Sequence, residues 1–390
     1  MALSRALNLC RSFSTVSSEP LRVCIVGSGP AGFYTVDKIL KAHEGAEVDI
    51  VDLLPTPFGL VRSGVAPDHP ETKVAQNRHC SFIGNVSLGA SIFLAELHEL
   101  YDSVVLSYGA ESDQALGIPG EELSWLGYML PENLFGGINL APDLKSSDTA
   151  FIIGQEELKN NRIKRRLHEL LSRAATPATS VCNPGQRELH FVFFRKPDRF
   201  LESDDQSGRV AGLCKEKTIL KEDVGSGKQI AVGTGLFEEM ECGLILKSVG
   251  YKSVPVDGLP FDHHKGIVPN VGGRVLSEAS GDAEVEKGLY VCGWLKRGPT
   301  GIVATNLYCA EETVSSFSED VKRGVVRSRS GLSKHGREGL LQLLDSRNVK
   351  IVPFGGWEKI DSEEKRRGGL KNKRREKLTT WQELLEVATK

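Results

Sequence analysis

The sequence contains no C-x-x-C pair among its eight cysteines. Zinc ribbons, iron–sulfur ligand sets and thioredoxin-type dithiols all depend on closely paired cysteines, so the sequence favours none of these classes. The cysteines are therefore expected to be buried reduced thiols, and no metal site is predicted.

Long apolar runs and a strong net charge are also missing. No window approaches the roughly 18 consecutive apolar residues that predict a membrane span. The formal net charge is −2, which favours neither a nucleic-acid-binding protein nor an enzyme for acidic substrates. What is present is a chain of 390 residues, long enough for two domains, with 41 glycines. Abundant glycine suits tight turns and close approach of backbone to ligand.

The first 18 residues, MALSRALNLCRSFSTVSS, contain no acidic residue but two arginines and five serines. This composition, with one apolar face in a helical conformation, is typical of a mitochondrial or plastid transit peptide. The Arg-x-Phe-Ser stretch favours the mitochondrion, and a frayed terminus is the alternative. We therefore expect a targeting segment at residues 1–18.

A βαβ unit follows, because an apolar run at 21–26 (LRVCIV), a helical pattern at 33–41 and a second apolar run at 48–52 (VDIVD) succeed one another. Further helices are expected at 96–100, 156–174, 311–322 and 380–388. Further strands are expected at 103–107, 149–153, 191–195, 209–221, 229–233, 244–248 and 289–293. The charged stretch 365–377 is predicted to be a solvated, partly disordered surface.

The first strand runs into GSGPAG, which matches G-x-G-x-x-G. Gly27 permits the tight turn, Gly29 lets the backbone approach a pyrophosphate, and Gly32 lets the helix pack closely on the sheet. Asp52, at the end of the second strand, can accept hydrogen bonds from ribose hydroxyls and disfavours a 2′-phosphate. This pattern predicts a site for FAD or NAD, and the spacing does not choose between them.

A second strand-to-turn junction lies near the far end of the chain, where LYVCG (289–293) leads into WLKRGPTGIVAT. A helix is expected to follow as far as Phe317, and its N-terminus could stabilise negative charge on a reduced flavin ring. Trp294 could stack on such a ring. A surface turn with a basic pair is the alternative interpretation.

Six stretches together closely resemble the adrenodoxin reductase family, the mitochondrial NADPH:ferredoxin oxidoreductases, in a plant-like form. They are CIVGSGPAGFY, PTPFGLVRSGVAPDHPETK, VVLSYGAESD, LGIPGE, LILKSVGYKS and YVCGWLKRGPTGIVAT. The resemblance implies an α/β fold with a Rossmann-like FAD-binding domain built from both ends of the chain. It also implies a second, NADP-binding domain, truncated here. The implied segments are the transit peptide 1–18, FAD-binding parts 19–113 and 254–390, the latter ending in a basic tail, and the truncated NADP-binding domain 114–253.

The resemblance implies electron transfer from NADPH through FAD to a [2Fe–2S] ferredoxin in the mitochondrial matrix, by a monomer that binds no nucleic acid. Peripheral association with the inner membrane is left open. Asp68 and His69 match a loop beside the flavin and are the catalytic candidates. The positions that match FAD contacts of the family are Ala31, Asp52, Leu60, Leu88, Trp294, Gly301, Ile302 and Val303.

A basic cluster on the expected helix 156–174 is the candidate docking surface for the acidic ferredoxin. It consists of Arg162, Lys164, Arg165 and Arg166. Basic clusters steer acidic partners and speed their encounter, and the family docks ferredoxin with arginines in this region. A solvated helix face is the alternative.

The sequence departs from the family pattern at SDTAFIIGQEELKNN. In the family this strand continues into a second glycine motif that holds NADPH, and a later arginine pair neutralises its 2′-phosphate. Here Gly154 and Gln155 lead directly into a charged helix, so the NADPH site is largely missing. Helical turns are also missing after residues 70–73, and residues 124–139 match nothing in the family. Such abrupt departures from the family pattern are typical of altered splicing or of a mispredicted gene model.

Losing βα units should leave residues 124–183 poorly packed, because a parallel strand needs its neighbours and its crossover helix. Three hypotheses follow. The chain is an FAD-dependent NADPH:ferredoxin reductase, an FAD-binding form that docks ferredoxin but accepts no hydride, or a translation product that never folds stably. Weak or absent NADPH oxidation is expected of this chain.

Overall fold

The computed structural model describes most of both ends of the chain and part of its middle. The described residues are 20–63, 80–123, 126–128, 139–140, 162, 165–166, 169, 188–189, 192–205, 208–222, 229–278, 283–326 and 334–390. The chain divides into two compact units. One, which we call the terminal unit, contains the chain up to Asp113 and from Gly250 onward; the other, the inserted unit, is Gln114–Val249.

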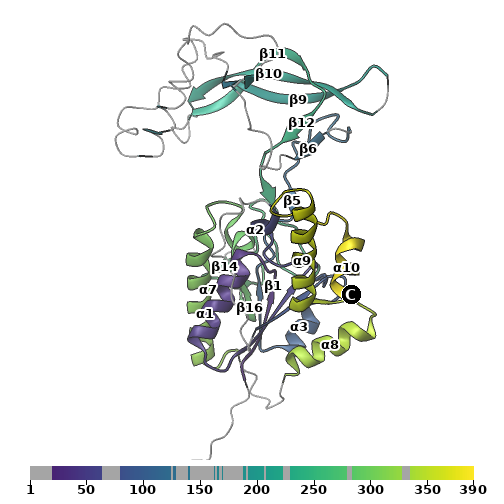
Figure 1. Cartoon of the computed structure of the whole chain (residues 1–390). Helices are drawn as coiled ribbons and strands as arrows, with labels where there is room; N and C mark the ends of the chain where they lie inside the picture. The colour runs from purple at the N-terminus through teal and green to yellow at the C-terminus, as the bar shows by residue number, and fades with distance from the viewer. Residues whose placement is uncertain are drawn as a thin grey trace, which may run out of the picture. The chain divides into compact units, whose positions relative to one another are not determined.

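The terminal unit is built on an eight-stranded sheet in the order β14-β15-β16-β4-β1-β2-β3-β17. Its strands are β1 Arg22–Val26, β2 Glu47–Asp52, β3 Cys80–Gly84, β4 Ser103–Leu106, β14 Asn270–Val271, β15 Arg274–Leu276, β16 Val285–Val291 and β17 Val352–Pro353. The five central strands, from β16 to β3, pair in parallel, and the edges are antiparallel. The predicted parallel α/β sheet from both ends of the chain is therefore confirmed (Figure 1).

Alternate side chains of β1 enter two separate cores, as the twofold repeat of a strand requires. Val23 and Ile25 pack into the core beneath α1 and α7, whereas Cys24 and Val26 pack into the core beneath α3 and α8. The helices of this unit are α1 Pro30–Ala42, α2 Leu60–Ser63, α3 Leu94–Leu100, α6 Trp294–Arg297, α7 Thr305–Lys322, α8 Gly336–Ser346, α9 Phe354–Leu370 and α10 Trp381–Thr389. Burial on both faces explains why the central strands are nearly continuous apolar runs.

The described part of the inserted unit contains a three-stranded antiparallel sheet in the order β11-β10-β9. Its strands are β9 Arg195–Glu202, β10 Val210–Glu222 and β11 Gln229–Glu241, with short pairs β6 Leu126–Tyr128 with β12 Ile245–Lys247, and β7 Asn139–Leu140 with β8 Glu188–Leu189. At the boundary, within the terminal unit, β5 Ser112–Asp113 pairs with β13 Tyr251–Lys252.

One strand prediction in the inserted unit was misplaced and another was too short. The strand expected at 191–195 begins only at Arg195, because Phe194 has a left-handed backbone with φ 54°. The strand expected at 229–233 continues to Glu241, since β10 pairs with β11 on both sides of a bulge near Glu216. The expected strand 149–153 lies outside the described residues. So do most of the expected helix 156–174 and most of the region 124–183, for which poor packing was predicted.

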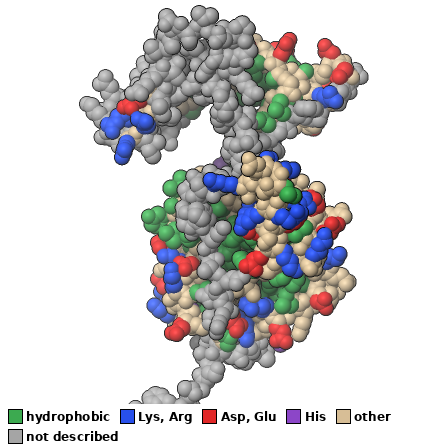
Figure 2. Space-filling view, viewed as in Figure 1, with side chains coloured by type: hydrophobic (Ala, Val, Ile, Leu, Met, Phe, Trp, Pro, Cys, Tyr) green, Lys and Arg blue, Asp and Glu red, His purple; other side chains and the backbone are tan. Residues whose placement is uncertain are grey.

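The prediction of a solvated surface at 365–377 is confirmed for most of this stretch, in which all four lysines are exposed. The prediction of partial disorder was wrong for residues 365–370, which lie in α9. Acidic side chains of α9 neutralise the basic ones: Glu363 pairs with both Arg366 and Arg367. Figure 2 shows lysines, arginines and acidic side chains intermixed on the visible face of the terminal unit.

The cysteines that the structure describes are free thiols. The predicted burial is confirmed for Cys24, Cys214, Cys292 and Cys309, whereas Cys80 and Cys242 are only partly buried. Within the described ranges, no helix combines the length and apolar character needed to cross a membrane.

Candidate functional site

The glycine motif forms the turn between β1 and α1. Gly27 has φ 106°, and a Cβ there would lie 2.6 Å from the carbonyl carbon of Ser107. A Cβ on Gly32 would lie 2.0 Å from the carbonyl oxygen of Gly27. Gly29 differs from both, because a Cβ at that position would meet nothing within 4 Å. Two glycines therefore let the turn form, and the third faces open space.

The N-terminus of α1 is suited to an anion. Gly29 is the N-cap and provides no side-chain cap, Pro30 occupies the first turn, and that turn contains no acidic residue. The positive end of the helix dipole is therefore not offset by the helix's own side chains. Amide groups at such an end, beside an open glycine, fit a pyrophosphate. The residues present thus satisfy the requirements of a dinucleotide.

Asp52 ties the turn to the end of β2. Its carboxylate accepts hydrogen bonds from Ser28 N–H at 2.6 Å, Ser28 Oγ at 2.5 Å and Leu54 N–H at 2.8 Å. Burial raises the pKa of Asp52, and these hydrogen bonds act in the opposite direction. A carboxylate has about four acceptor positions, so one remains for a ribose hydroxyl. Asp52 therefore has a structural role that the sequence did not predict.

The loop that leads into α2 lies directly on the glycine turn. Phe58 N–H donates to the carbonyl oxygen of Ser28 at 2.9 Å. A Cβ on Gly59 would lie 3.3 Å from Gly29 Cα, which places the two backbones in contact. Leu60, a predicted FAD contact, follows at once and is 37% exposed. The structure thus brings this predicted residue to the edge of the turn.

The turn that follows β16 contacts α1, which begins within the glycine motif, through Gly293. This residue has φ 73°, and a Cβ there would lie 2.5 Å from Cβ of Ala31. Trp294 follows, stacked on Tyr251 with ring centroids 5.7 Å apart, and its Nε1 is buried without a hydrogen-bond partner. An unpartnered buried donor on the residue that follows Gly293 is a fitting position for a ligand acceptor atom.

Four other predicted FAD contacts lie in two places. Three of them lie between α6 and α7: Gly301 has φ 84°, Ile302 is 73% exposed and Val303 is half-buried. Leu88 lies after β3 in a bridge with Ile92, partly buried against the core beneath α3.

Three predicted site residues lie outside the described residues, namely Asp68, His69 and Lys164. The same holds for Gly154 and Gln155, where the sequence departs from the family pattern. Arg162, Arg165 and Arg166 are helical and exposed.

Sequence reasoning missed Ser28 and Phe58. Ser28 occupies an unconstrained position of the glycine motif, and its bond to a residue far along the chain leaves no mark in the spacing. Phe58 has φ 82°, a left-handed backbone that an aromatic side chain rarely adopts. The only available clue was the glycine that follows it.

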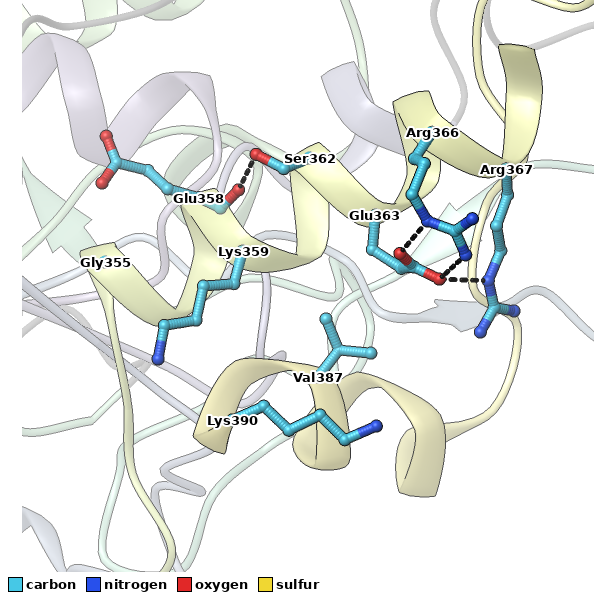
Figure 3. Close-up of a pocket in the computed structure, with 9 residues that line it drawn as sticks. All are labelled: Gly355, Glu358, Lys359, Ser362, Glu363, Arg366, Arg367, Val387 and Lys390. Atoms are coloured by element: carbon cyan, nitrogen blue, oxygen red, sulfur yellow. Dashed lines mark hydrogen bonds and ion pairs between the residues drawn. The ribbon is translucent and has the colours of Figure 1, made fainter. Parts of the chain in front are cut away.

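A pocket of about 600 Å³ lies elsewhere, between α9 and α10 (Figure 3). It is lined by Gly355, Glu358, Lys359, Ser362, Glu363, Arg366, Arg367, Val387 and Lys390. None of the predicted site residues lines it, and Glu363, one of its two glutamate carboxylates, is already paired with two arginines. The pocket is therefore not the candidate site.

Comparisons with known proteins agree with this geometry, although no family model matches the chain. The mitochondrial NADPH:adrenodoxin oxidoreductase of Arabidopsis thaliana is 52% identical over 476 residues, which cover 97% of this chain and 97% of that protein. The protein of the same name from Homo sapiens is 37% identical over 483 residues, covering 97% and 94%.

Among solved structures, FprA from Mycobacterium tuberculosis superimposes with a TM-score of 0.80 at 27% identity, covering 95% of this chain and 100% of that one. FprA in complex with NADPH gives a TM-score of 0.78. With more than half of its residues identical to the plant relative over nearly the whole of both sequences, the chain belongs to the NADPH:adrenodoxin oxidoreductase family.

Proposed function

We propose that the chain is a flavoprotein oxidoreductase that binds FAD at the turn between β1 and α1 and transfers electrons from NADPH to a mitochondrial [2Fe–2S] ferredoxin. The observation that carries the proposal is the open space at Gly29, at the uncapped N-terminus of α1. The names of the relatives and the complex of FprA with NADPH support the choice of reaction.

The chain's own residues would hold FAD in a defined way. Amides of the glycine turn bind the pyrophosphate, and the remaining acceptor position of Asp52 binds a ribose hydroxyl. The unpartnered Nε1 of Trp294 is available to an acceptor atom of the cofactor, and the exposed side chain of Ile302 is available to cover an apolar ring. FAD, when bound, exchanges either two electrons or one, which suits a hydride donor and a one-electron acceptor.

The finer assignments are proposals of the same kind. Asp68 and His69 are the proposed catalytic residues beside the flavin. We assign 19–113 and 254–390 to the FAD-binding domain and 114–253 to a shortened NADP-binding domain. The division of the chain after Asp113 supports the first boundary, and the division before Gly250 lies four residues ahead of the second.

The proposed partner is an acidic ferredoxin, docked by the basic cluster of Arg162, Lys164, Arg165 and Arg166. The exposure of Arg162, Arg165 and Arg166 supports this role, because basic side chains must be accessible to steer a partner. The acid-free segment 1–18 and the mitochondrial names of the relatives support import into the mitochondrial matrix.

A second candidate function is an FAD-binding protein that accepts no hydride from NADPH. Two observations favour it. The strand pattern at 149–153 is followed by Gly154 and Gln155 and then by charged residues, without a second glycine motif. The alignment with the plant relative runs over 476 residues, which exceeds the 390 residues of this chain, so it contains positions that the chain leaves empty.

An anaerobic NADPH titration of the purified protein separates the two functions, with the Arabidopsis relative as positive control. Bleaching of the flavin absorbance would establish hydride transfer in this chain. A flavin band that stays oxidised while the control bleaches would establish the second function. Purified protein that contains no flavin and takes up none would refute both.

A further inference from the structure

We propose that Glu364, in the C-terminal helix α9, is a positioning residue for the cofactor turn, acting through a buried ion pair with Arg62. In so far as the positioned turn binds FAD, this inference rests on the proposed function. The two residues are far apart in sequence, and nothing in the glycine motif points to α9.

The ion pair has the geometry of a strong, fixed contact. The side chain of Glu364 is fully buried and receives Arg62 in a bidentate manner, with Nη2 at 2.5 Å from Oε1 and Nη1 at 3.0 Å from Oε2. Arg375 Nη1 lies 2.8 Å from Oε2, and Leu378 N–H donates to Oε1 at 3.0 Å. Planar, doubly hydrogen-bonded pairs of this kind fix orientation as well as distance.

The surroundings of Glu364 favour its ionised form. Burial is the largest influence on its pKa and raises it, but the hydrogen bonds from Arg62 and Arg375 outweigh burial, so the pKa lies below its ordinary value. Arg375 is in turn held by Asp361 at 2.5 Å. Removing the carboxylate charge would deprive both Arg62 and Arg375 of a shared, fully buried counter-charge.

Backbone hydrogen bonds connect Arg62 to the glycine turn. Its backbone N–H donates to Gly59 O at 3.1 Å, and Val61 N–H donates to Phe58 O at 3.1 Å, so residues 58–62 form one hydrogen-bonded segment. At the other end of the segment, Phe58 N–H is bound to the carbonyl oxygen of Ser28 within the glycine turn. A shift of Arg62 therefore moves the residue that contacts the turn.

Phe58 needs external support, because its φ of 82° is unfavourable for an L side chain. Trp357 of α9 supports it with an edge contact at 5.8 Å between ring centroids, and Phe33 of α1 stacks on it at 5.1 Å. Trp357 and Glu364 are seven residues apart, which places them on one face of α9. One face of α9 thus holds the segment at both ends, by an apolar contact and by an ion pair.

Glu364→Gln tests the inference, with Asp320→Asn as the matched control. Asp320 is also a buried carboxylate, bound by Arg274 Nε at 2.7 Å and by Tyr290 Oη at 2.8 Å, but it lies on α7 and binds neither the segment nor the turn. The first measurement is hydrogen exchange of the Phe58, Val61 and Arg62 amides in flavin-free protein. The second is the FAD dissociation constant, measured well below the unfolding temperature of each variant.

We expect Glu364→Gln to speed exchange of these three amides by about tenfold or more and to weaken FAD binding by a similar factor. Asp320→Asn should change neither quantity by more than about threefold, since it leaves the segment intact. Equal effects of the two variants, or exchange at Phe58 within about threefold of the wild type in Glu364→Gln, would overturn the inference.

Two outcomes are covered by further measurements. If Glu364→Gln does not fold, Arg62→Lys keeps the charge but loses the bidentate geometry, and faster exchange at Phe58 in that variant decides the question. If the wild type binds no FAD, the proposed function fails, while the exchange measurement in flavin-free protein still decides whether Glu364 positions the segment.

Discussion

Replacing Gly29 by alanine should separate cofactor binding from folding, because the two depend on different glycines of the same turn. A Cβ at Gly29 meets no protein atom within 4 Å, and its φ of −75° is open to any residue. The loss of unfolding free energy in Gly29→Ala should therefore be small, a few tenths of a kcal/mol for an N-cap glycine and at most about 1 kcal/mol. The methyl group would instead occupy the open space that we propose for the pyrophosphate.

The expected loss of affinity follows from the hydrogen bonds that the phosphate would make. A charged hydrogen bond contributes about 1.5–3 kcal/mol, and moving the phosphate outward should remove at least one. Because 1.4 kcal/mol is about a tenfold change in a binding constant, FAD binding should weaken by about tenfold to a hundredfold or more. Gly32→Ala is the contrasting variant, since its Cβ would lie 2.0 Å from the Gly27 carbonyl oxygen and α1 must shift. It should lose about 1–3 kcal/mol of stability together with FAD.

Thermal unfolding of flavin-free protein and a fluorescence titration with FAD measure the two quantities independently. Gly29→Ala should unfold near the wild-type temperature and yet fail to retain flavin. A Gly29→Ala protein that binds FAD as tightly as the wild type would refute the assignment of this turn to the pyrophosphate.

Three other outcomes are expected. Arg337→Met leaves the buried carboxylate of Asp49 with only the hydroxyl of Tyr101 at 2.9 Å, and should reduce the unfolding free energy by about 1–3 kcal/mol in urea denaturation, given that the arginine is partly solvated. The pKa of Glu364 is lowered, so its ion pair stabilises the fold at pH values above its ordinary pKa of 4.5, and this contribution is lost as the pH falls through the lowered value. The acid-induced loss of unfolding free energy should therefore be smaller in Glu364→Gln than in the wild type. An equal dependence of the unfolding free energy on pH in the two proteins would contradict the pairing. The double substitution Arg162→Glu and Arg166→Glu should slow association with an acidic ferredoxin by about tenfold at low salt in stopped-flow measurements. An association rate that is unchanged and independent of salt would contradict docking of the ferredoxin by this cluster.

Local and periodic features of this fold were predictable from the sequence. The βαβ unit at the start of the chain follows from an apolar run, a glycine turn and a second apolar run, because each element buries its own side chains in a regular period. The parallel order around β1 follows from the same pattern, since crossover helices connect parallel strands.

Long-range contacts and unusual backbone conformations were not predictable. Charge counts at 365–377 suggested partial disorder because they could not show that α9 would be fixed in place by the pairing of Glu364 with Arg62, some 300 residues earlier. The left-handed backbone of Phe58 is likewise set by packing between Phe33 and Trp357, which no local pattern encodes. In both cases the structure depends on tertiary contacts that local patterns and composition do not contain.

The pairing of β5 with β13 has a consequence for how the chain tolerates changes of length. Asp113 lies opposite Tyr251 and Ser112 opposite Lys252, so the chain leaves the terminal unit and returns to it at adjacent positions. Adjacent ends of this kind allow inserted segments of different lengths without altering the host fold. Exon loss or gain within the inserted unit can therefore change that unit while the glycine turn between β1 and α1 keeps its geometry. The same arrangement delays completion of the sheet during synthesis, because β16 must leave the ribosome before it can pair with β4.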